Sequence, residues 1–186
     1  MLPSGPELIE GLDHVAGAPV DAGVVELIVM RPEVDERVVL EVAQLDEHQG
    51  LVGDSWLQRG SRRTADGLAD PLGQLAIMSS RAAALLVGRH DRWPLAGDQL
   101  FLDLDLSEAS LPAGARLAVG SAVVEITVKP HRGCAKFAAR FGSDALRLAN
   151  SEVGLALNLR GRNARVIQSG RVRVGDDVVR LDVARS

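Results

Sequence analysis

The residues best suited to chemistry lie in one short stretch, Val128–Phe137, which reads VKPHRGCAKF. It contains the single cysteine, Cys134, together with His131, Arg132 and both lysines of the chain. Cationic neighbours favour the thiolate form of a cysteine. A thiolate can attack an electrophile, carry a sulfur atom or bind a soft metal. The stretch therefore predicts a reactive thiol or a metal ligand at Cys134, with His131 as a nearby donor or base.

A second interpretation of Cys134 is structural. If a helix starts close to Cys134, helical periodicity places Phe137 and Phe141 on the same face and Lys136 and Arg140 opposite. A cysteine on an apolar face usually behaves as a small buried hydrophobe. A thiol at a helix start, in contrast, lies where backbone N–H groups stabilise negative charge. The residues alone leave both interpretations open.

The composition is that of a soluble globular protein: 186 residues, of which 46% are hydrophobic and 25% charged. The net charge of −4 and the 3% of aromatic residues argue against a nucleic-acid partner. A single cysteine excludes an internal disulfide and a cysteine-cluster metal site. No signal-peptide pattern and no apolar segment of membrane-spanning length occur, so we expect a cytoplasmic protein without a membrane partner.

Most of the chain has the pattern of short strands, which predicts a mostly β protein with short helices, an α+β barrel or sandwich. We expect a lead-in over 1–23, with one helical turn at 7–12, a β domain over 24–182 and a tail over 183–186. Helices are expected over 80–88 and within 134–159. Strands are expected over 24–30, 37–45, 74–80, 99–106, 163–184 and, as a hairpin turning at Gly120-Ser121, 115–130.

Two local patterns carry further expectations. In the strand 99–106 leucines alternate with aspartates, which predicts a half-buried strand with Asp103 and Asp105 on its solvent face. A Gly-Asp pair recurs at Val52–Asp54, Ala96–Asp98 and Val174–Asp176. We interpret each pair as turn chemistry, in which glycine adopts a positive φ and aspartate accepts bonds from nearby backbone.

Several of these pieces, in this order, resemble the MOSC domain family, named for the C-terminal domain of molybdenum-cofactor sulfurases. The most specific piece is LPAGARLAVGSAVVEITVKPHRGCAKF, 111–137, in which Pro-x-x-x-Cys directly precedes a helix. The other pieces are HQGLVGD, LAGDQLFLDLDLS and GRNARVIQSGRVRVGDDV, at 48–54, 95–107 and 161–178. With the strand VVELIVMRP in front, the resemblance covers about residues 24–182.

The resemblance implies a MOSC-like β-barrel and a role in sulfur transfer or molybdenum-cofactor binding. Cys134 would accept sulfur as a persulfide or would bind molybdenum held by a pterin (molybdopterin). The sulfur would come from a cysteine desulfurase-type partner, which would itself carry the pyridoxal phosphate. Catalytic roles are expected for Cys134 and His131. The expected cofactor-binding residues, some of them arginines able to hold a pterin phosphate, are Arg132, Lys136, Asp98, Gln99, Arg162 and Arg165.

Two departures from the family pattern keep other functions open. Many members have Gly-Glu-Asn-Leu where this chain has Gly97-Asp98-Gln99-Leu100, and the segment 55–75 lacks a common His-Gly-Gly sequence. The chain could therefore be a non-catalytic barrel that binds a small molecule or serves as a scaffold. A third possibility is a molybdenum-dependent reductase of N-hydroxylated compounds.

Overall fold

The computed structural model describes residues 3, 5–61 and 64–181. Within this part of the chain seven strands form a closed ring, in the order β1, β6, β5, β9, β8, β7, β11 and back to β1. Strands β5 and β6 run parallel, and the other neighbours in the ring are antiparallel. The ring strands are β1 (Ala22–Met30), β5 (Leu75–Ser79), β6 (Leu100–Asp103), β7 (Arg116–Val119), β8 (Ala122–Ile126), β9 (Arg162–Gln168) and β11 (Asp177–Leu181). The expected α+β barrel is therefore confirmed.

Four further strands and seven helices surround the barrel in the described residues. Strand β2 extends the ring at β1, and β10, β3 and β4 form a small separate sheet. These strands are β2 (Val38–Leu40), β3 (Val42–Asp46), β4 (Gly50–Leu51) and β10 (Gly170–Arg173). The α-helices are α1 (Gly5–Glu10), α2 (Leu12–Ala16), α3 (Trp56–Arg59), α4 (Ser80–Val87), α5 (Ala135–Phe141), α6 (Ser143–Ala149) and α7 (Glu152–Ala156), with 3-10 turns η1 (Pro71–Gly73) and η2 (His90–Ala96).

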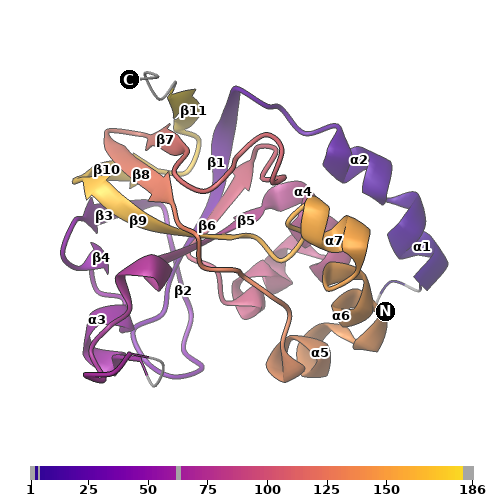
Figure 1. The fold of residues 1–186 in the computed structure, drawn as a ribbon, viewed down its shortest axis with the longest axis horizontal. Coiled ribbons are helices and arrows are strands. Elements are labelled where there is room, and N and C mark those ends of the chain that lie inside the picture. Colours follow the sequence, from indigo (N-terminus) through magenta and orange to yellow (C-terminus); the bar gives the residue numbers. More distant parts are fainter. Residues whose placement is uncertain (1–2, 4, 62–63, 182–186) are drawn as a thin grey trace.

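The hydrophobic side chains form two clusters. One fills the barrel and includes Val25, Ile77 and Val124. The other lies between the outside of the barrel and the helices, and includes Met78, Phe101 and other apolar residues of α1, α4, α5 and α6. Figure 1 shows these helices together with α2 and α7 on one side of the barrel, with the small sheet and α3 on the other. No described helix is long and apolar enough to span a membrane.

Three expected elements differ from the structure. The expected strand 37–45 is divided at Glu41, because β2 pairs with β1 whereas β3 pairs with β10 and β4. The strand expected to be half-buried, β6, is buried on both faces, since Leu100 and Leu102 face the barrel core and Phe101 packs in the outer cluster. The lead-in contains two helices, α1 and α2. The boundary at 182 and the tail 183–186 lie outside the described residues.

The three Gly-Asp pairs share one backbone feature but differ in what the aspartate binds. Each glycine has a φ close to +90°, as the turn interpretation expects. Asp54 and Asp176 accept backbone N–H bonds, from Trp56 and Arg173 respectively. Asp98 and Asp54 each have an arginine partner in the protein interior, Arg160 and Arg31 respectively. The turn interpretation therefore accounts for the backbone of all three pairs, whereas the side chains of Asp54 and Asp98 also form buried ion pairs.

Candidate active site

Cys134 is exposed to solvent and caps the N-terminus of α5. Its backbone is extended, with φ −127° and ψ 175°, so its side chain does not continue the helical stripe of Phe137 and Phe141, which are both buried. The prediction of a buried structural cysteine is therefore wrong, because it extrapolated helical geometry to a residue that is not helical. A solvent-accessible thiol is what a sulfur acceptor or metal ligand requires.

The turn before Cys134 is fixed by contacts with α6 and the residue that follows it. The side chain of Asn150 accepts a hydrogen bond from the Gly133 N–H at 3.0 Å and donates one to the Gly133 carbonyl at 3.2 Å. A Cβ at position 133 would lie 2.6 Å from Leu146 Cδ1, so glycine permits this close approach. Asn150 thereby positions the residue next to Cys134, although no sequence motif pointed to it.

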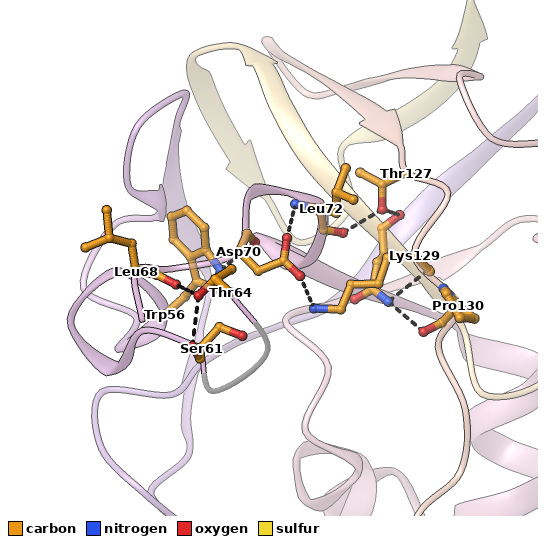
Figure 2. Close-up of polar contacts among 10 residues, drawn as sticks. Trp56, Ser61, Thr64, Leu68, Asp70, Leu72, Thr127, Lys129 and Pro130 are labelled. Carbon is orange, nitrogen blue, oxygen red and sulfur yellow. Dashed lines mark hydrogen bonds and ion pairs between the residues drawn. The ribbon is translucent and has the colours of Figure 1, made fainter. Parts of the chain in front are cut away.

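The strand exit that leads to Cys134 is held from two sides. Asn163 on β9 donates to the carbonyls of Lys129 and Pro130 at 3.1 and 3.3 Å. Contacts with Asp70 and Leu72, drawn in Figure 2, hold the other side: Lys129 Nζ lies 2.8 Å from Asp70 Oδ2, and the Thr127 hydroxyl donates to the Leu72 carbonyl. The loop that lacks the His-Gly-Gly sequence thus packs against the segment that carries the candidate site.

Behind this segment lies the buried ion pair of Asp98 and Arg160, with His131 beside it. Asp98 is fully buried, and its Oδ2 accepts a hydrogen bond from Arg160 Nη1 at 2.6 Å. The Arg160 guanidinium also donates to the Ala96 carbonyl and lies over the Phe137 ring, 5.0 Å from its centroid. His131 Nδ1 is 3.5 Å from the second carboxylate oxygen, Asp98 Oδ1, and neither of these buried atoms has a hydrogen-bond partner.

The environment of His131 keeps its imidazole neutral at pH 7. Burial is the main cause and the positive charge of Arg160 the next, and together they outweigh the attraction of Asp98 and lower the pKa of His131 from 6.5 to about 4. His131 therefore adds no full positive charge that would favour a thiolate at Cys134. With its proton on Nδ1, the side that faces Asp98, the ring would keep the Nε2 lone pair available as an acceptor or base.

A cavity of about 380 Å³ opens beside this group. Three cationic side chains line it, from Lys129, Arg132 and Arg162, and His131 and Glu108 also contribute. Arg132 is exposed and has no ion pair or hydrogen bond within the described part of the chain. The cavity and the exposed thiol are thus joined by the four-residue segment from His131 to Cys134.

A comparison with protein families assigns this chain. The MOSC domain family matches residues 80–179, which is more than half of the sequence. The chain belongs to the MOSC domain family. No curated protein sequence matches it.

Solved structures with the same MOSC fold come from several bacteria. The YuaD protein of Bacillus subtilis superposes with a TM-score of 0.63 at 17% sequence identity, over 84% of this chain and 94% of that one. YiiM of Escherichia coli gives 0.54 at 17% identity, over 88% and 72%. YiiM of Geobacillus stearothermophilus gives 0.51 at 18% identity, over 89% and 75%. At these low sequence identities, the similarity shows a shared fold and nothing more.

Within this MOSC barrel the expected site residues occupy different surroundings. The cavity is lined by His131, Arg132 and Arg162. Cys134 and the exposed Lys136 come directly after this stretch of the chain. Asp98 does not line the cavity, because it lies behind His131. Arg165 points elsewhere, since it is half-exposed and pairs with Glu125 at 2.6 Å. Sequence reasoning missed Arg160 and Asn163, for which no local motif exists.

Gln99 serves the backbone of the MOSC barrel. Its side-chain oxygen accepts the Ala76 N–H at 2.7 Å, and its amide nitrogen lies 3.4 Å from the Gln74 carbonyl. The side chain is fully buried and does not line the cavity. Cofactor binding by Gln99 stays a prediction, whereas a structural role follows directly from these bonds.

The substitution Gln99→Leu should lower the free energy of unfolding by about 1–3 kcal/mol, because it leaves the buried Ala76 N–H without an acceptor. Urea unfolding followed by circular dichroism measures this change. The matched control is Gln168→Leu, at the exposed last residue of β9, for which we expect a change below about 0.5 kcal/mol. Equal effects of the two substitutions would contradict the structural role of Gln99.

Proposed function

We propose that this MOSC protein carries sulfur on Cys134 and binds a pterin cofactor beside it. The observation that carries the proposal is the exposed Cys134 at the end of a pinned segment whose preceding residues line a cation-bearing cavity. A thiol held in this way is open to a partner protein, and Arg132, two residues before it in the chain, lines a space for a small anionic molecule.

The sulfur transfer requires a persulfide on the partner, a cysteine desulfurase-type enzyme that carries its own pyridoxal phosphate. The Cys134 thiolate attacks the outer sulfur of that persulfide, and a new S–S bond forms at Cys134 Sγ. The S–S bond of the donor breaks, and the electron pair leaves with the donor's thiolate. No external oxidant or reductant is needed, because one persulfide is exchanged for another.

The residues around the cavity fit the chemistry of molybdopterin. Arg132 and Arg162 can hold its phosphate by charge-assisted hydrogen bonds, and the exposed Lys136 can add positive charge. The thiolate of Cys134 is a ligand type that suits molybdenum, which would supply redox chemistry when bound. The described residues hold no group of three or more His, Cys, Asp or Glu side chains that could bind a metal, so the cofactor would provide the remaining ligands.

The test is intact-mass spectrometry of the protein after incubation with a cysteine desulfurase and its cysteine substrate. We expect a mass gain of one sulfur atom that thiol reductants remove, and no gain in Cys134→Ser, because this variant lacks the only cysteine. Lys136→Gln is a charge control that leaves the thiol in place and should slow the transfer without abolishing it. A wild-type protein that gains no sulfur would contradict the carrier role.

Elemental analysis of the protein, purified from cells that make molybdenum cofactor, separates the remaining functions. Molybdenum together with reduction of an N-hydroxylated compound would favour the reductase alternative over a pure carrier. Neither sulfur nor molybdenum, with the fold intact, would favour a non-catalytic barrel that binds a small molecule. Molybdenum that is lost in Cys134→Ser would support Cys134 as the metal ligand.

A further inference from the structure

Arg162 is a buried cation at the cavity, and it has an unusual partner. Its side chain, on β9, is 8% exposed, so its charge requires an anion close by. Among the described residues that anion is the Glu108 carboxylate, which forms an ion pair with Arg162 Nη1. Glu108 itself is 62% exposed. One side of this ion pair is therefore fixed in the protein, whereas the other remains in contact with water.

Glu108 belongs to the segment 104–115, whose backbone is held independently of the ion pair. The buried side chains of Leu106 and Leu111 anchor the segment on both sides of Glu108. Asp105 accepts hydrogen bonds from Ser107, and the Glu108 N–H donates to the Ala156 carbonyl at 3.1 Å. The Glu108 carboxylate can therefore leave Arg162 by side-chain rotation alone, without unfolding the segment.

A second ion pair on β9 shows the contrast. Glu125 is only 15% exposed and contacts both Arg165 and Arg116, each of which is about half-exposed. There the carboxylate is the buried member and binds two cations at the surface. At the cavity the order is reversed, because the cation is buried and the carboxylate is the member that can move away.

We propose that Arg162 is a preformed binding site for the phosphate group of a small-molecule ligand, and that Glu108 occupies this site as an internal competitor until the ligand displaces it. The other cations of the cavity, Arg132 and Lys129, favour an incoming group that carries more negative charge than one carboxylate. Lys129 already pairs with Asp70, which leaves Arg132 as the cation able to turn toward the ligand. The inference deepens the proposed function, because Arg162 is one of its cofactor-binding residues.

Removal of the internal competitor is the direct test. Titration calorimetry with inorganic phosphate should show binding that is about fivefold tighter in Glu108→Gln than in the wild type, the equivalent of one partly exposed ion pair. The matched control, Glu125→Gln, makes the same chemical change outside the cavity; it releases only arginines that are about half-exposed and already hydrated, so it should change the phosphate affinity much less than Glu108→Gln does. Equal affinity of wild type and Glu108→Gln, or no phosphate binding by either protein, would overturn the inference.

A double variant guards against misfolding. Glu108→Gln alone leaves the buried Arg162 without its anion and could destabilise the fold, whereas Arg162→Gln with Glu108→Gln removes both charges and leaves no unpaired ion. This double variant should fold and lose the tighter phosphate binding, and retained binding would overturn the role of Arg162. Cys134→Ser should bind phosphate as the wild type does. Failure of the anion site can therefore be distinguished from failure of sulfur transfer, which only the cysteine experiment reports.

Discussion

The substitution Arg160→Met should destabilise the protein by about 3–5 kcal/mol, because it removes the positive partner of a fully buried carboxylate. Methionine keeps most of the apolar length of the side chain and can still pack against Met78 and Phe137. The loss therefore reports the missing charge and its bonds to Asp98 and Ala96, not a cavity in the core. Urea unfolding at pH 7 measures it.

Two further variants make this result specific. Arg165→Met, on strand β9 that follows Arg160 in the chain, removes a guanidinium that is about half-exposed, and its cost should stay below about 1 kcal/mol. Adding Asp98→Asn to Arg160→Met removes the isolated buried charge and should recover part of the lost stability. If Arg160→Met and Arg165→Met cost the same, the buried pair is not what stabilises this region.

The turn at 96–98 explains why this pair matters for the site. Arg160 binds the Ala96 carbonyl, and Arg31, itself paired with Asp54, donates to the Gly97 carbonyl at 2.8 Å. Two arginines from distant parts of the chain therefore fix the turn that presents Asp98 to His131. Because His131 lines the cavity, a substitution at Arg160 should alter the position of His131 in the cavity even though Arg160 does not line it.

The sequence predicted the barrel because its strand patterns are local. The alternation of β7 and β8 and the turn at Gly120 could be read from neighbouring residues. The division of 37–45 into β2 and β3 could not, since both halves have the same alternating pattern and differ only in which distant strand they pair with. The burial of Phe101 likewise depends on helices that come from elsewhere in the chain.

In the candidate site, too, the sequence predicted what depends on neighbouring residues and missed what depends on distant ones. Cys134 and its helix start were visible in one ten-residue stretch, and so were His131 and Arg132. The partners that fix this stretch, Asn150 and Asn163, come from later elements and carry no motif. The exposure of Cys134 was also beyond the sequence, because the residue at a helix cap does not follow the periodicity of the helix after it.

The pH dependence of stability should reveal the lowered pKa of His131, whose side chain is mostly buried. Its pKa is lowered to about 4 in the folded protein, mainly by burial and then by Arg160, from 6.5 in the unfolded chain. As the pH falls below 6.5 the unfolded chain therefore takes up a proton that the folded protein does not. The stability of the folded protein falls as the pH is lowered from about 6.5 to about 4, and the part due to His131 is about 2–3 kcal/mol.

The variant His131→Asn isolates this contribution, because asparagine can donate to Asp98 and does not titrate. Carboxylates whose pKa is lowered in the folded protein, such as Glu125, also destabilise the fold when acid protonates them. This loss is the same in both proteins. On acidification the unfolding free energy should therefore fall by about 2–3 kcal/mol less in His131→Asn than in the wild type. The control His48→Asn, at an exposed histidine, should follow the wild-type profile. Parallel profiles of His131→Asn and wild type would show that the pKa of His131 is the same in the folded and unfolded protein, and would contradict the lowered pKa.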